Sequence, residues 1–189
     1  MQSLGWTVEE SSHEQNTVIG PVKFTNIIAT LDPDAPRRLV IACHYDSKIS
    51  PQGFLGATDS AVPCAQMINL AKTMNTELQS IKGQRPLTLQ FIFFDGEEAF
   101  KQWSSTDSLY GSRNLAQKWA QTPYSKNGID GNHLDRIEVF MLLDLLGASK
   151  PVIKSSHTKT DPWFKRLMHI EENVVRNGLV RNNNHRIFR

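Results

Sequence analysis

Three short apolar runs, each followed at once by polar or charged residues, dominate the pattern of this chain. They lie at residues 39–43 (LVIAC), 87–94 (LTLQFIFF) and 137–143 (IEVFMLL). Apolar runs of this length, rich in β-branched and aromatic residues, are typical of strands that are buried on both faces of a sheet. We therefore expect all three strands inside a sheet, with 137–143 away from its edges.

Between these runs, apolar residues recur at the spacing of a helix. Asp59 or Ser60 suits the N-cap of the first helix, and a second helix is expected over residues 108–121. Polar loops are expected at residues 79–85 and 122–132. The apolar face predicted for the first helix consists of Cys64, Met67, Ile68, Ala71 and Met74.

A third helix is predicted to begin at Asp161, which suits an N-cap before Pro162 at the first helical position. Gly178 suits the position that ends this helix, and three asparagines at 182–184 predict a turn. The stripe expected on this helix is Trp163, Phe164, Leu167, Met168, Glu171, Val174 and Val175.

Before the first apolar run, residues 6–12 and 23–31 are extended and predict antiparallel strands around a polar loop at Gly20-Pro21. Strands that alternate with amphipathic helices indicate an α/β protein. We expect one domain over residues 1–189, a three-layer α/β/α sandwich with a mixed, mostly parallel central sheet.

Composition excludes several classes of function. The 189 residues carry a net charge of +2 without a basic block, which argues against a nucleic-acid partner. No apolar run approaches the roughly 18 residues of a membrane span, and no signal-peptide core follows Met1. Two cysteines, Cys43 and Cys64, are too few for a four-cysteine zinc site. Two buried free thiols and one disulfide both remain open at this point.

Acidic residues and a histidine collect where the apolar runs stop. Carboxyl ends of parallel strands meet at one sheet edge, where like charges are costly unless a cation offsets them. Carboxylate plus imidazole suits zinc, although Asp59 alone reads as a helix cap and His44 alone as a core histidine. The residues concerned are His44 and Asp46, then Glu97 and Glu98, and then Asp144.

Five blocks of this sequence resemble animal glutaminyl-peptide cyclotransferases, which are zinc-dependent relatives of the di-zinc aminopeptidases. The resemblance spans about residues 24–179, in family order. It implies a zinc exopeptidase-like fold and conversion of an N-terminal Gln (or Glu) of peptides to pyroglutamate. The blocks are ACHYDSK (42–48), GATDSAVPCA (56–65), FFDGEEAF (93–100), DSLYGSR (107–113) and LLDLLGA (142–148).

The resemblance also implies residue roles. Asp59 and Glu98 match two ligands of a single catalytic zinc. Glu97 matches the glutamate that shuttles protons, and Asp144 matches an acid that supports the shuttle. Trp103 matches a tryptophan of the substrate pocket wall.

Further implications concern His44, Asp46 and the cysteines. His44 and Asp46 resemble the first-metal motif of the di-zinc peptidases, which the cyclases retain without using it for a second metal. Cys43 and Cys64 match a disulfide of the secreted members. The resemblance thus implies a secreted or Golgi enzyme, and we expect a monomer.

The family's histidine ligand lies in a motif that this sequence does not contain. None of His157, His169 and His185 sits in such a motif, and the family's leading helix is missing before Met1. By this resemblance the chain is expected to be truncated at both ends. Two alternatives remain: a di-zinc aminopeptidase, and an inactive fragment that lacks its third zinc ligand.

Overall fold

The computed structural model describes residues 1–126, 128–180 and 186–189. The turn expected at residues 182–184, and His185, lie outside the described residues. The chain divides into two compact units, Met1–Leu146 and Gly147–Arg189, and each is described by itself. No helix in the described part of the chain is both long and apolar enough to cross a bilayer.

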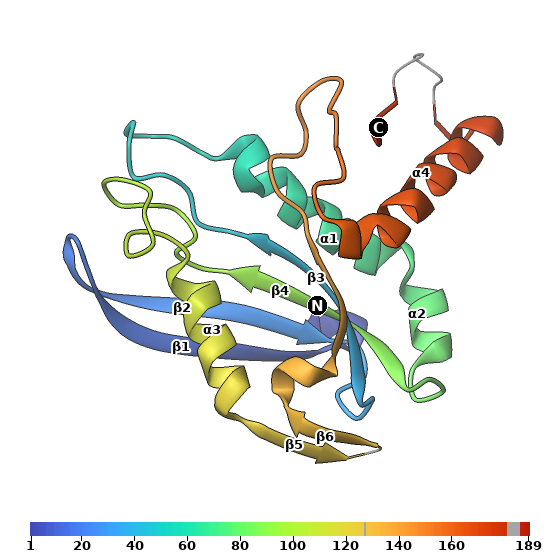
Figure 1. The fold of residues 1–189 in the computed structure, drawn as a ribbon, viewed down its shortest axis with the longest axis horizontal. Helices are drawn as coiled ribbons and strands as arrows, with labels where there is room; N and C mark the ends of the chain where they lie inside the picture. The colour runs from blue at the N-terminus through green and yellow to red at the C-terminus, as the bar shows by residue number, and fades with distance from the viewer. Residues whose placement is uncertain (127, 181–185) are drawn as a thin grey trace. The chain divides into compact units, whose positions relative to one another are not determined.

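The first unit is built on a five-stranded mixed sheet in the order β1-β2-β4-β3-β7 (Figure 1). β2 pairs antiparallel with β1 and β4, whereas β3 pairs parallel with β4 and β7. The carboxyl ends of β3, β4 and β7 therefore meet at one edge, as expected. The strands are β1 (Thr7–Thr17), β2 (Gly20–Thr30), β3 (Arg37–His44), β4 (Leu87–Phe94) and β7 (Ile137–Leu142).

Helices cover both faces of this sheet, which confirms the three-layer arrangement. β4 supplies both cores, because successive side chains of a strand point to opposite faces. Phe91 and Phe93 pack in one cluster with Met67, and Ile92 and Phe94 pack in the other with Leu115. The helices concerned are α1 (Val62–Thr73) and α2 (Asn75–Ile81) on one face and α3 (Tyr110–Gln121) on the other.

The first hairpin is longer than the sequence indicated. The strands are antiparallel as predicted, but they continue to Thr17 and from Gly20, so the polar loop shrinks to a tight turn. His13 stacks on Phe24 at 5.4 Å between ring centroids, within the stretch expected to be loop. Cross-strand contacts of this kind stabilise polar strands that lack a clear alternating pattern.

The predicted cap of α1 is wrong. The helix begins at Val62, and no side chain caps it, because Asp59 and Ser60 turn toward the sheet edge instead. Its predicted apolar face is buried only in part: Met67 and Ala71 are buried, whereas Ile68 and Met74 are exposed. The chain also remains helical in α2, where part of a polar linker was expected.

The expected loop at residues 122–132 is also wrong. β5 (Pro123–Lys126) and β6 (Ile129–Asn132) form an antiparallel hairpin of their own. A capping box between Asn132 and Asp135 then starts a short 3₁₀ turn that leads into β7. Both strands are only four residues long, which is too short for a periodic signal.

The interior position expected for β7 is contradicted. β7 pairs with β3 alone and forms an edge of the sheet within the described residues. Its burial alternates, and Phe140 and Leu142 are 49% and 53% exposed. An apolar sequence shows that a strand can be buried on both faces, but it does not show what covers it.

The second unit contains one long helix, α4 (Asp161–Arg176). Asp161 is its first helical residue and Thr160 holds the cap position, one residue before the prediction. Pro162 lies in the first turn, and Gly178 has a left-handed φ of 68° just past the end, as predicted. The apolar stripe is not fully buried, but Phe164 contacts Phe188 edge to face at 5.8 Å.

Candidate active site

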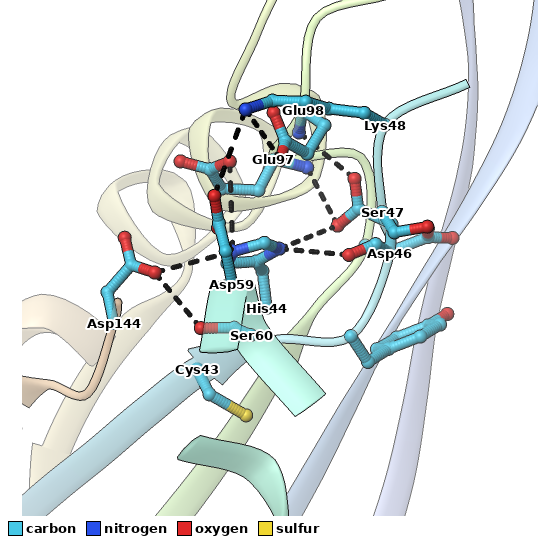
Figure 2. Close-up of polar contacts among 12 residues, drawn as sticks. Cys43, His44, Asp46, Ser47, Lys48, Asp59, Ser60, Glu97, Glu98 and Asp144 are labelled. Carbon is cyan, nitrogen blue, oxygen red and sulfur yellow. Dashed lines mark hydrogen bonds and ion pairs between the residues drawn. The ribbon is translucent and has the colours of Figure 1, made fainter. Parts of the chain in front are cut away.

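His44, the last residue of β3, lies at the centre of the polar cluster (Figure 2). Its side chain is only 1% exposed. Nε2 lies 3.0 Å from Asp59 Oδ1 and 3.5 Å from Asp144 Oδ1, and Nδ1 lies 3.1 Å from the Asp46 carbonyl oxygen. Strand β3, the turn before α1 and the segment after β7 therefore converge on one imidazole.

The surroundings of His44 favour its charged form. Burial by itself would lower the pKa of the imidazole, because desolvation penalises charge. A hydrogen bond with Asp46 and the negative charges of Glu97, Asp46 and Asp144 outweigh that effect and raise the pKa to about 9. The carboxylates around His44 thus stabilise a positive charge at this position.

Asp46 connects this histidine to the glutamate pair. Its Oδ1 accepts a hydrogen bond from the Glu97 backbone N–H and its Oδ2 accepts one from Glu98, both at 3.0 Å. Burial opposes the charge of Asp46, but hydrogen bonds from His44 and from these two amides lower its pKa. One carboxylate thus fixes the backbone of both glutamates.

The turn that carries the glutamates is also held from α3. Backbone N–H groups of Leu109, Tyr110 and Gly111 bond the carbonyl oxygens of residues 97, 96 and 95 at 2.9, 2.7 and 3.1 Å. Gly96 has a φ of 61°, and a β-carbon there would overlap the ring of Phe24. The glycine in DGEE therefore serves this turn and not the chemistry.

Glu97 and Glu98 have different surroundings although they are adjacent. Burial raises the pKa of Glu97 to about 7, with further contributions from Glu98, Asp144 and Asp46, while His44 opposes the rise. Its Oε2 lies 4.0 Å from His44 Nε2. Glu97 can therefore exchange protons near neutral pH.

Glu98 is more deeply buried, at 6% exposure, and its Oε1 has no hydrogen-bond donor among the described residues. Burial and the charge of Asp59 raise its pKa. The nearest positive group is Lys48, whose Nζ lies 3.8 Å from Glu98 Oε1 and 3.9 Å from Asp59 Oδ2. A buried oxygen without a donor suits a cation ligand, so Asp59 and Glu98 fit a divalent metal.

A second donor set overlaps the first. His44, Asp59 and Asp144 each offer a ligand atom, and these atoms lie within 4.8 Å of one another. Glu98 is not part of this group. Asp144 Oδ1 also accepts a hydrogen bond of 3.0 Å from the hydroxyl of Ser60. Asp59 therefore lies close to His44 on one side and shares Lys48 with Glu98 on the other.

A cavity of about 510 Å³ opens over these groups. Asp59, Glu97, Glu98 and Asp144 line it on the polar side. Trp103 lines it from the loop after β4 and is 55% exposed. The residues expected to act on a substrate therefore face a common space.

Sequence reasoning missed two members of the site. Lys48 approaches both carboxylates of the first donor set, and Ser60 bonds Asp144. Lys48 lies two positions after Asp46, but no spacing rule distinguishes it from a surface lysine. Ser60 was read as a possible cap, which is the more frequent role of a serine before a helix.

Cys43 and Cys64 form a disulfide, with their α-carbons 5.7 Å apart. This separation lies within the range that a disulfide permits, which confirms the pairing. The bridge ties the end of β3 to the first turn of α1. It therefore holds His44 close to the segment that carries Asp59.

Comparison with known proteins gives a family match and relatives that agree with it. Residues 26–180 match peptidase family M28. The glutaminyl-peptide cyclotransferase-like protein of Bos taurus is 50% identical over 182 residues, which cover 94% of this chain and 47% of that protein. The glutaminyl-peptide cyclotransferase of Gloydius blomhoffii is 48% identical over 188 residues, covering 94% and 51%.

A solved structure shares the fold. The glutaminyl cyclase of Macrostomum lignano matches with a TM-score of 0.88 and 40% identity, covering 100% of this chain and 59% of that one. The chain spans about half the length of the curated relatives described above. The mixed sheet and its helical layers thus occur in a protein of that description.

Proposed function

Because this chain belongs to peptidase family M28, we propose that it forms the catalytic part of a glutaminyl-peptide cyclotransferase. The support is its identity of 50% and 48% with proteins so named, and its likeness to a glutaminyl cyclase structure. The substrate would be a peptide with an N-terminal Gln, or Glu. The activity of the whole protein is part of the proposal, since about half of its relatives' length is covered.

In the proposed reaction, the α-amine nitrogen attacks the side-chain carbonyl carbon of the same glutamine. The new C–N bond closes the ring, the bond to the side-chain nitrogen breaks, and ammonia leaves. Glu97 would take the proton from the attacking amine and return one to the departing ammonia. Asp144, near the same histidine, would keep this charge network in place.

Asp59 and Glu98 would hold a single zinc ion. When bound, zinc supplies Lewis-acid polarisation of a carbonyl oxygen. Zinc usually takes three protein ligands in a catalytic site, and the resemblance implies that the third is a histidine in a motif that this sequence does not contain.

One observation carries the proposal: two adjacent glutamates, whose backbones are held by one carboxylate, have side chains in different surroundings. Asp46 holds both backbones, yet Glu98 Oε1 is buried without a hydrogen-bond donor among the described residues. Glu97 lines the same cavity as Glu98, and its Oε2 lies 4.0 Å from His44 Nε2. This division suits one ligand and one proton carrier.

The test compares Glu97→Gln, Glu98→Gln and Asp59→Asn, with exposed Glu77→Gln as the matched control. Bound zinc is measured by elemental analysis, and ammonia release is measured with a Gln-initiated peptide. We expect Glu97→Gln to keep zinc and lose turnover by at least about a hundredfold. Glu98→Gln and Asp59→Asn should lose both.

Two outcomes would count against the proposal. Zinc loss in Glu97→Gln with spared zinc in Glu98→Gln would reverse the two roles. Release of the amine from a leucine chromogenic substrate, without cyclisation of the Gln peptide, would identify an aminopeptidase instead.

The remaining parts of the proposal concern the domain organisation, the oligomeric state and the cellular location. A single catalytic domain over residues 1–189, acting as a monomer, is what we infer from the resemblance. The disulfide between Cys43 and Cys64 supports a secreted or Golgi location, because such bonds persist in oxidising compartments. Retention of the bridge in protein isolated from a secretory compartment would test this location.

A further inference from the structure

The loop between β4 and α3 is wrapped around one buried carboxylate. Asp107 is 3% exposed. Its oxygens accept hydrogen bonds of 2.9 Å from the backbone N–H groups of Phe100, Lys101 and Gln102, and one of 2.7 Å from the Tyr110 hydroxyl. Three successive amides thus point at a single anion, which fixes the path of the chain through residues 100–102.

A second anchor closes the other end of the loop. The Asp107 backbone N–H donates to the hydroxyl of Ser104 at 3.0 Å, and the hydroxyl of Ser108 donates to the Ser104 carbonyl oxygen at 2.7 Å. Arg113, on α3, donates to the carbonyl oxygen of Ser108 at 2.6 Å. Trp103 therefore lies between two fixed points that both depend on the 104–108 segment.

The anchors themselves are rigid because Tyr110 belongs to the core. Its side chain is fully buried and stacks on Phe24 at 4.9 Å with an interplanar angle of 7°. Phe100 contacts the same tyrosine at 5.6 Å. The carboxylate of Asp107 thus joins a polar loop to a well-packed part of the core.

The other side of the loop faces the cavity. Phe100, Lys101 and Trp103 line it together with Glu97 and Glu98, whereas Asp107 does not. The carboxylate therefore shapes a wall of the cavity without reaching the space where a substrate would lie.

We propose that Asp107 is a positioning residue that holds Trp103 as a wall of the substrate cavity. The proposal rests on the proposed function for the identity of the substrate, but not for the geometry of the loop. It also accounts for the DSLYGSR block. Asp107 and Tyr110 hold the loop, and a β-carbon at Gly111 would overlap Asn26 and the Asp95 carbonyl.

An amide of the same size cannot replace this carboxylate. Asparagine offers one acceptor oxygen, and its NH₂ group would face N–H donors. Bonds to a charged acceptor are also about twice as strong as neutral ones. Consistent with these bonds, the pKa of Asp107 is lowered, although burial by itself would raise it.

The experiment measures the affinity for a Gln-initiated peptide of three variants: Asp107→Asn, Trp103→Ala and the double variant. We expect Asp107→Asn to weaken peptide affinity about tenfold, with zinc content and far-ultraviolet circular dichroism unchanged. In the Trp103→Ala background the same change should have an effect of less than about twofold, since its target is gone. Exposed Asp130→Asn is the control.

A spectroscopic measurement keeps the proposal independent of the reaction. Acrylamide quenching is compared between each protein and its Trp103→Phe counterpart, which isolates the emission of Trp103. Quenching of Trp103 should rise in Asp107→Asn even if no peptide binds. Tyr110→Phe removes one of the four hydrogen bonds to the Asp107 carboxylate, so quenching of Trp103 should rise in this variant too, but by less. This second variant tests the proposal even if Asp107→Asn does not fold.

Two results would overturn the proposal. One is unchanged quenching of Trp103 in both loop variants. The other is an affinity loss from Asp107→Asn that persists in full in the Trp103→Ala background, because this would show a route that does not pass through the tryptophan.

Discussion

At the residue scale, the site depends on a carboxylate, Asp46, that does not line the cavity of about 510 Å³. Asp46 bonds both glutamate amides and the ring of His44. Its position after β3 places it opposite the turn after β4, because these two strands are parallel neighbours. The histidine-acid pattern after the apolar run indicated chemistry at this point, but only the structure assigns Asp46 to the glutamates.

We expect Asp46→Asn to lower zinc affinity by about tenfold to a hundredfold, the range found for residues that orient metal ligands. The amide can accept from only one of the two glutamate N–H groups, so the turn at Glu98 loses a fixed geometry. Chelator competition measures the affinity. Asp130→Asn on β6 is the control, and equal affinities of the two variants would contradict the expectation.

The contribution of the Asp107 carboxylate to the free energy of unfolding should depend on pH. Its pKa is lowered in the folded state, so its contribution is present above the ordinary carboxyl pKa of about 3.9 and is lost as the pH falls further. Urea unfolding of the wild type and of Asp107→Asn should therefore differ by a constant free energy from about pH 7 to about pH 5. The difference should shrink below about pH 4, and a difference that grows on acidification would contradict this.

At the element scale, the helices and strands that could be predicted are those with a long periodic pattern or a strongly apolar sequence. The strands at β3 and β4, the helix α3 and the left-handed glycine after α4 are confirmed. The hairpin of β5 and β6 is too short to show a period. The cap of α1 was missed because Asp59 and Ser60 bond across the sheet edge, and a local rule cannot see such partners.

The disulfide joins two of these elements and should stabilise both. Cys43 and Cys64 are separated by 21 positions. Closing such a loop contributes about 3 kcal/mol in the chain-entropy model, so Cys64→Ser should lower the free energy of unfolding by about that amount. Chemical denaturation measures the loss. Wild-type protein under reducing conditions should match the variant, and a loss confined to the variant would point to packing instead.

At the scale of the whole molecule, β7 forms an edge of the sheet among the described residues, although its apolar sequence predicted an interior strand. An apolar strand predicts burial, but which neighbour buries it depends on the arrangement of all elements. Phe140 and Leu142 line a cavity of about 590 Å³ with Leu115 and Trp119 of α3. This surface is largely apolar, which is unusual for a solvated face.

Although we infer that the functional form is a monomer, we expect the 189-residue chain to aggregate through β7. Among the described residues this strand pairs with β3 alone and exposes Phe140 and Leu142, which favours intermolecular pairing. Phe140→Lys should reduce association, because a charge on this strand opposes both pairing and apolar contact. Leu55→Lys is the matched control, as Leu55 is exposed in the loop before α1. Light scattering across a range of concentrations measures the association. Equal scattering from both variants would mean that another surface carries it.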